Sequence, residues 1–202
     1  MSGRSNSSPP VVLAITGASG APYAVRLLNS LSAARVPVRL IVSTTGWRLL
    51  AEEAGIEDET ALRNATGAGD DVVAYDDSDR GATPASGSTP SRGMVICPCS
   101  MGTLASIAQG TTRSLIERAA DVVLKERRKL VLVPRETPYS TIQLENMLRL
   151  SRAGAVILPA SPGFYHRPTR IEELVDFVVA RILSHLDVAH DIAPQWHSGE
   201  PR

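Results

Sequence analysis

Charged side chains gather around one short apolar segment, residues 130–133. Arg118 precedes this segment, the stretch 125–128 reads Lys-Glu-Arg-Arg, and Arg135 and Glu136 follow it directly. The whole chain carries 21 basic and 21 acidic residues, so its formal net charge is zero. A local excess of cations in a neutral chain predicts a site for a small anion. It disfavours nucleic acid as a partner, because proteins that bind nucleic acid usually carry a basic surplus.

A second segment makes the expected anion more specific. Residues 11–15 form an apolar strand pattern that runs into residues 16–20, Thr-Gly-Ala-Ser-Gly, a turn of small residues that opens a helix. Such turns hold phosphate groups. The turn lacks the Gly-x-Gly-x-x-Gly spacing of dinucleotide sites, and Ser43 stands where an acidic residue would bind a ribose. The pattern therefore disfavours NAD and favours a mononucleotide such as FMN.

Five apolar segments rich in Val and Ile alternate with helical patterns. They are residues 11–15, 38–42, 94–97, 130–133 and 155–158. Continuous apolar strands separated by helices predict a parallel sheet covered on both faces, a doubly wound α/β fold of the Rossmann-like or flavodoxin-like kind. With 202 residues, the chain is expected to form a single domain over residues 11–196. Residues 1–10 are expected to be a disordered tail, and residues 197–202 a short C-terminal tail.

Polar residues follow the predicted strands at their carboxyl ends, where ligands bind in open α/β sheets. Small hydroxyl residues recur at these ends, for example at Ser19, Ser43 and Ser100. A single serine at such a place is usually a helix cap, whereas recurrence along one edge favours a ligand site. Arg135 and Glu136 directly follow another buried strand, which favours a functional role for this charged pair.

The other cations have an ordinary interpretation as well. Arg118 and Lys125 lie seven residues apart on a predicted helix and share one face of it. They either form part of the anion site or belong to a solvated flank with the nearby carboxylates, namely Glu117, Asp121 and Glu126. We prefer the solvated interpretation for Arg127 and Arg128.

The last predicted helix has the clearest start signal in the chain. Thr169 and Glu172 form a capping-box pattern. The buried positions expected on this helix are Ile171, Leu174, Val175, Val178 and Ile182. Residues 76–92, rich in Gly, Pro, Ser, Thr and Asp, are expected to be irregular and to form a lid, a binding loop or an ordering element at a subunit contact.

Several remaining features narrow the class of protein. Cys97 and Cys99 are the only cysteines, and their side chains point to opposite faces of an extended segment, which argues against a disulfide. Their spacing and the late position of all four histidines argue against a metal site. No apolar run approaches the roughly 20 residues of a membrane span, so we expect a cytoplasmic protein. The segment 163–166, Gly-Phe-Tyr-His, is either a loop that covers the sheet edge or the source of a phenol that binds an anion.

Seven short segments complete the sequence pattern. They are residues 16–20, 84–88, 97–103, 115–122, 125–128, 133–138 and 162–166. In this order they closely resemble the UbiX flavin prenyltransferases, and the likeness spans about residues 11–196. The single segments are unremarkable, but the ordered set is specific.

The resemblance implies a flavoprotein that transfers a dimethylallyl group from dimethylallyl phosphate to N5 and C6 of reduced FMN and releases phosphate. The product would be the prenylated FMN that UbiD-type decarboxylases use. It also implies a large homo-oligomer, a dodecamer, with sites at subunit contacts, so that some cations serve a neighbour's site. No metal is implied, because fixed Lys, Arg and Tyr donors can stabilise the leaving phosphate.

The resemblance also implies roles for individual residues. The FMN contacts would be Gly17, Ala18, Ser19, Ser43, Ser100, Met101, Gly102, Thr103 and Arg135. The residues around dimethylallyl phosphate would be Arg118, Lys125, Tyr165 and Arg181, with Trp196 as an aromatic wall. The catalytic groups would be Ser19, Glu53, Lys125 and Glu136. Glu52 is an alternative to Glu53, because the surrounding helix has little motif of its own.

Two other functions remain open at this stage. One is a decarboxylase of the cysteine-oxidising flavoprotein group, which shares the fold, although the Pro-x-Met-Asn stretch of that group is missing here. The other is a non-catalytic carrier that stores or delivers FMN.

Overall fold

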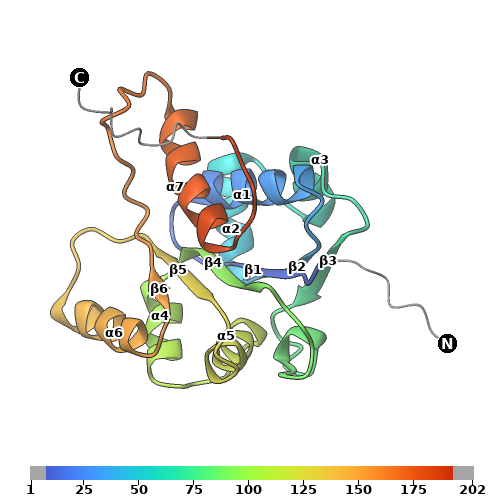
Figure 1. The fold of residues 1–202 in the computed structure, drawn as a ribbon, viewed down its shortest axis with the longest axis vertical. Helices are drawn as coiled ribbons and strands as arrows, with labels where there is room; N and C mark the ends of the chain where they lie inside the picture. Colours follow the sequence, from blue (N-terminus) through green and yellow to red (C-terminus); the bar gives the residue numbers. More distant parts are fainter. Residues whose placement is uncertain (1–7, 193–202) are drawn as a thin grey trace, which may run out of the picture.

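Short apolar segments build a parallel sheet of six strands, shown in Figure 1 for a computed structural model that describes residues 8–192. The strands are β1 (Val11–Ile15), β2 (Val38–Val42), β3 (Val72–Asp76), β4 (Gly93–Cys99), β5 (Leu130–Pro134) and β6 (Val156–Ile157). Their order across the sheet is β3-β2-β1-β4-β5-β6. Every residue of β1, β4 and β5 is buried, as expected for central strands that are covered on both faces.

Helices cover both faces of this sheet (Figure 1). The helices are α1 (Ala21–Ala33), α2 (Thr44–Ala54), α3 (Glu59–Thr66), α4 (Met101–Ala108), α5 (Leu115–Lys125), α6 (Thr141–Arg152) and α7 (Ile171–His185), with the short 3₁₀ helix η1 (Thr83–Ala85). One apolar core holds α1, α2, α3 and α7, and a second core on the opposite face holds α4, α5 and α6. The prediction of a doubly wound α/β fold is confirmed.

Strand β3 was missed in the sequence, and the physical reason is its place at the edge of the sheet. Within residues 8–192 it pairs with β2 alone, and its residue Val73 is 48% exposed. Its five residues therefore do not form the continuous apolar run that marks a central strand. The last strand, predicted at residues 155–158, pairs over Val156–Ile157 alone.

The start of α7 was predicted to within two residues, but its capping residues were wrong. Arg170 is the N-cap, and the N–H groups of Thr169 and Arg170 both donate to Glu173, at 2.7 and 3.4 Å. Glu172 instead pairs with the Arg170 guanidinium. Ile171 was expected to be buried and is 73% exposed at the first position of α7. The predicted positions that are buried are Val175, Val178 and Ile182.

The segment 76–92 is tied to the body of the protein by Arg128. The Arg128 guanidinium donates to the carbonyl oxygens of Gly87 (2.6 Å) and Thr89 (2.7 Å). The solvated interpretation of Arg128 is therefore wrong, since its donors bind this loop. For Arg127 it is consistent with the structure, because that residue is exposed.

Some predictions fall outside the described residues. Trp196 and residues 197–202 lie beyond them, and so does most of the predicted tail at residues 1–10. Within the part of the chain that the structure describes, no helix is long and apolar enough to cross a membrane.

Candidate functional site at the carboxyl edge of the sheet

The sheet order reverses between β1 and β4, and Thr16 joins the ends of these two strands. Its buried hydroxyl donates to the carbonyl of Pro98 at 2.9 Å and accepts the N–H of Ser100 at 2.8 Å. The turn that begins at Gly17 and the segment that begins at Ser100 therefore lie next to each other. This reversal point is where open α/β sheets bind their ligands.

An internal carboxylate occupies the N-terminus of α1. Glu53 Oε2, on α2, accepts the N–H groups of Gly20 and Ala21, both at 2.8 Å, and the Ser19 side chain also donates to Glu53. The partial positive charge of the helix end is thus matched by Glu53. The turn was predicted to hold phosphate, but the N–H groups of Gly20 and Ala21, where the turn opens the helix, are already engaged by this carboxylate.

The pKa of Glu53 reflects these contacts. Its partial burial alone would raise the pKa, but the hydrogen bonds from Gly20, Ala21 and Ser19, with the charge of Arg135, together hold it below the usual value. Glu53 is therefore ionised at neutral pH.

The neighbouring acidic residue, Glu52, points elsewhere. Its carboxylate accepts a hydrogen bond from Arg48 at 2.7 Å on the exposed side of α2. Of the two carboxylates that the sequence left open, the structure places Glu53 at the turn.

The residues that follow β5 lie on the same edge. Arg135 Nε donates to the carbonyl oxygen of Ser19 at 3.1 Å. The carboxylate of Glu136 accepts the N–H of Thr137 at 3.0 Å. Burial raises the pKa of Tyr139, the charge of Glu136 raises it further, and Arg135 acts in the opposite direction. Tyr139 thus lies near both charged residues, a neighbour that the sequence analysis missed.

Two further helices begin at this edge with neutral caps. Ser43 accepts the N–H of Gly46 at 3.0 Å at the start of α2, and Ser100 accepts that of Thr103 at 3.2 Å at the start of α4. The helix-cap interpretation is confirmed for both serines. Both helix ends carry partial positive charge, and among residues 8–192 no carboxylate binds them, so they fit the phosphate and polar groups of FMN better than the start of α1 does.

Close packing holds the turn against the start of α2. A Cβ atom at Gly17 would lie 2.4 Å from Thr45 Oγ1, and one at Gly46 would lie 2.5 Å from the carbonyl oxygen of Ile15. Neither position has room for a side chain, which explains why glycine is required at both. The result is a rigid cradle between β1 and α2.

Lys125, one of the predicted cations on α5, does not join this edge within one chain. Helix α5 packs on the opposite face of the sheet from α1, and Lys125 ends it five residues before β5 begins, at the amino edge of the sheet. Arg118 pairs with Asp121 at 3.0 Å and Lys125 pairs with Glu126 at 2.7 Å. Arg118 and Lys125 thus form ion pairs with nearby carboxylates, as the solvated-flank interpretation expects. Glu117 does not take part in these pairs, because it is buried and pairs with Arg113.

Small hydroxyl residues accompany Lys125 at the amino edge. A Cβ atom at Gly87 would lie 3.0 Å from Lys125 Nζ and 2.4 Å from Glu126 Oε1, so the loop lies directly on these side chains. The hydroxyls of Ser86 and Ser88 flank Gly87 and are 2.9 Å apart. The sequence showed this segment only as part of the family pattern and did not predict that it lies beside Lys125.

Tyr165 and Arg181 form a third group of predicted residues. The ring of Tyr165 meets Phe177 edge-on at 5.8 Å and His166 at 5.6 Å, and His166 stacks on Phe177. Arg181 lies one turn further along α7 and lines a cavity of about 280 Å³ with Phe177. Tyr165 is 52% exposed.

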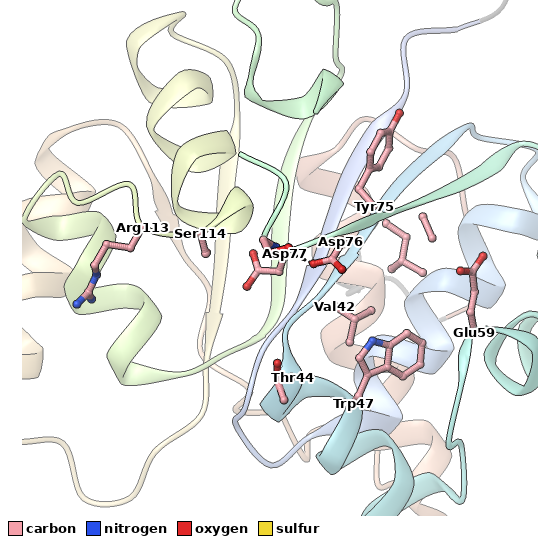
Figure 2. Close-up of a pocket in the computed structure, with 12 residues that line it drawn as sticks. Val42, Thr44, Trp47, Glu59, Tyr75, Asp76, Asp77, Arg113 and Ser114 are labelled. Atoms are coloured by element: carbon pink, nitrogen blue, oxygen red, sulfur yellow. Dashed lines mark hydrogen bonds between the residues drawn. The ribbon is translucent and has the colours of Figure 1, made fainter. Parts of the chain in front are cut away.

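A larger cavity, of about 600 Å³, opens at the ends of β2 and β3 (Figure 2). Trp47, Tyr75 and Asp77 are among the residues that line it, and Thr44 connects it to the start of α2. Among residues 8–192, no group of three or more His, Cys, Asp and Glu side chains is arranged to hold a metal ion. Cys97 and Cys99 are buried and not disulfide-bonded, and burial raises the pKa of both thiols, that of Cys99 to about 12.

Comparisons with known proteins agree with this geometry. A family model described as Flavoprotein matches residues 1–183. The flavin prenyltransferase UbiX of Pseudomonas aeruginosa is 50% identical over 194 residues, which cover 92% of this chain and 93% of that protein. The chain belongs to the UbiX flavin prenyltransferase family. The resemblance seen in the sequence is thereby confirmed.

Solved structures of the UbiX family share the fold closely. AnUbiX (PadA1), crystallised with FMN and dimethylallyl pyrophosphate, is 39% identical, with a TM-score of 0.88 over 95% of this chain and 99% of that one. A dodecameric FMN-dependent UbiX-like decarboxylase from Escherichia coli O157:H7 is 40% identical, with a TM-score of 0.86 over 94% and 100% of the chains. A PPC decarboxylase mutant is only 20% identical, with a TM-score of 0.56, and so shares the fold alone.

Proposed function

We propose that this UbiX-family chain transfers a dimethylallyl group from dimethylallyl phosphate to N5 and C6 of reduced FMN and releases phosphate. The observation that carries the proposal is the convergence of Ser19, Glu53 and Arg135 at the reversal point of the sheet, beside two helix starts with neutral caps. This is a site for a flat, singly phosphorylated ligand with polar edges.

FMN would be held by residues at the carboxyl edge. Ser43 and the start of α2, with the segment from Ser100 through Met101 and Gly102 to Thr103, supply hydroxyl and N–H groups. Gly17 and Ala18 supply a close backbone surface, and Arg135 supplies a guanidinium. When bound and reduced, the flavin supplies the nucleophilic ring atoms.

Charged side chains of the protein would stabilise the departing phosphate. Departure of phosphate from an allylic carbon requires stabilisation of the growing negative charge, and fixed cationic donors provide it. We propose that Arg118 and Lys125, with the hydroxyls of Ser86 and Ser88, serve this purpose together with Tyr165 and Arg181. Trp196 is proposed as the apolar wall beside the allyl group.

These groups lie on different faces of one subunit, so we propose that neighbouring subunits complete each site in a homo-oligomer, a dodecamer. Lys125 lies at the amino edge and Ser19 at the carboxyl edge of the same sheet, and one chain cannot bring them together without unfolding. The E. coli neighbour described above is a dodecamer, which supports this part of the proposal.

Proton transfer during ring closure needs a group near the flavin edge. Ser19 and Glu136 lie at this edge, and we propose that they carry the proton. Glu53 is held as an anion by two N–H groups, so its proposed task is to fix Ser19 and the start of α1. We also propose a cytoplasmic location and a UbiD-type decarboxylase as recipient of the product, both on the family resemblance alone.

Phosphate release separates the enzyme from an FMN carrier. Purified protein with FMN, a reductant and dimethylallyl phosphate, without oxygen, should release one inorganic phosphate for each flavin that is modified. The Lys125→Ala protein should bind FMN as before and release phosphate far more slowly. A wild-type protein that binds FMN tightly but releases no phosphate would be a carrier, and the proposal would be rejected.

A further inference from the structure

Glu117 is a buried carboxylate that none of the proposed steps uses. Among residues 8–192 it is the one Asp or Glu residue that is buried, with 9% of the whole residue exposed. Burial of a carboxylate is unfavourable unless hydrogen bonds and a partner charge compensate for the lost hydration. Its position in the first turn of α5, directly before Arg118, connects it with the proposed phosphate site.

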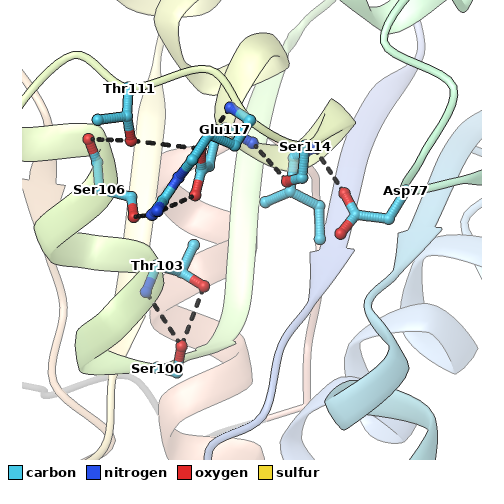
Figure 3. A network of polar contacts seen from close by, with 9 residues as sticks. Asp77, Ser100, Thr103, Ser106, Thr111, Ser114 and Glu117 are labelled. Carbon is cyan, nitrogen blue, oxygen red and sulfur yellow. Dashed lines mark hydrogen bonds and ion pairs between the residues drawn. The ribbon is translucent and has the colours of Figure 1, made fainter.

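The partners of Glu117 join α5 to the preceding helix, as Figure 3 shows. Its Oε2 accepts the N–H of Arg113 at 2.7 Å and the hydroxyl of Thr111 at 3.3 Å. Its Oε1 lies 3.7 Å from the Arg113 guanidinium, which in turn donates to the hydroxyl of Ser106 on α4 at 2.8 Å. The network therefore runs from α4 through the loop to α5.

The first turn of α5 is also hydrogen-bonded to Asp77, which directly follows β3. The N–H of Leu115 donates to the carbonyl of Asp77 at 2.7 Å, and the N–H of Ile116 donates to its carboxylate at 2.9 Å. Ser114 accepts the N–H of Glu117 at 3.4 Å. The first-turn donors of α5 are thus engaged within the chain, and they position the helix instead of binding a ligand.

We propose that Glu117 is a positioning residue, which sets where Arg118 and Lys125 stand by locking the first turn of α5 to α4. This inference rests on the proposed function. Helix α4 begins at the serine proposed to contact FMN, and α5 carries the cations proposed to contact phosphate. One buried carboxylate thereby fixes α5, which supplies the cations, relative to α4 of the same subunit, which contacts that subunit's own FMN.

Glu117→Gln and Arg113→Met test this role by a split between two kinetic constants. The KM for dimethylallyl phosphate should rise about tenfold in both variants, while kcat and the Kd for FMN change by less than about twofold. Arg113 is exposed, so its replacement should leave the fold intact even if that of Glu117 does not. Glu52→Gln, which removes an i,i+4 partner of Arg48 on the exposed side of α2, is the control and should leave the KM unchanged.

The double variant and a binding measurement complete the test. Because the two residues act through one another, the double variant should be no worse than the poorer single one. The Kd for inorganic phosphate, measured by calorimetry, should also rise in both single variants, and this readout does not depend on turnover. Unchanged KM and phosphate Kd in both variants would overturn the inference, as would fully additive effects. Failure of the wild-type protein to modify FMN would instead count against the proposed function.

Discussion

The carboxylate of Glu53 accepts the N–H of Gly20 at 2.8 Å, across 33 positions of sequence. At neutral pH this contact places an anion at the start of α1, where a phosphate would bind in many α/β proteins. It leaves the starts of α2 and α4 as the helix ends that fit FMN. We propose that the turn that follows β1 is a surface for the ligand, and Glu53 on α2 holds this turn in shape.

Replacement of Glu53 by Gln should lower turnover about tenfold or more, because the neutral amide holds Ser19 and the start of α1 less firmly. The measurement is the rate of phosphate release at saturating dimethylallyl phosphate. Glu52→Gln is the matched control on the same helix, since Glu52 pairs with exposed Arg48. Equal rates in the two variants would contradict a role of Glu53 in the site.

The lowered pKa of Glu53 also predicts how stability depends on pH. A carboxyl whose pKa is lower in the folded state stabilises the protein above the unfolded value, about 4.3, and this contribution is lost as the pH falls through the folded pKa. The Tm of the wild-type protein should exceed that of Glu53→Gln at neutral pH. The difference should shrink once the pH falls below about 4.3. A difference that is constant or grows in acid would contradict the assignment.

Shared sites predict that inactive subunits rescue one another. Lys125→Ala and Glu136→Gln should each be nearly inactive as pure proteins. When both variants are co-expressed in equal amounts and assemble at random, about one quarter of the sites should combine an intact Lys125 from one subunit with an intact Glu136 from its neighbour. About one quarter of wild-type activity should therefore return. No recovery in verified mixed oligomers would show that both residues belong to one subunit's site.

Thr16 should prove important for both stability and FMN binding. Thr16→Val leaves the Pro98 carbonyl and the Ser100 N–H without their partner in a buried place, at a cost of about 1–3 kcal/mol. The Kd for FMN should rise because the segment at Ser100 is no longer tied to β1. Urea denaturation and a flavin fluorescence titration measure the two effects. Thr16→Ser keeps the hydroxyl and should change both far less, and equal losses in the two variants would argue against the hydrogen bonds.

The sequence predicted the parts of the site that depend on local patterns. The strand before Gly17 and the serines at positions 43 and 100 follow from apolar runs and helix starts, so the edge of the sheet was predictable. The contact of Glu53 with Gly20 was not, because it depends on how α2 packs against α1. Glu117 looked like a surface partner of the cations, since only the loop before α5 reveals its burial. Without the family resemblance, nothing in the local pattern links Lys125 to Ser19.

The mass of the extracted flavin tests the central claim most directly. Wild-type protein is incubated without oxygen with FMN, a reductant and dimethylallyl phosphate, and the flavin is released and analysed by mass spectrometry. We predict a flavin heavier by one five-carbon prenyl unit, formed only when all three reagents are present. FMN of unchanged mass, recovered from protein that demonstrably bound it, would contradict the account.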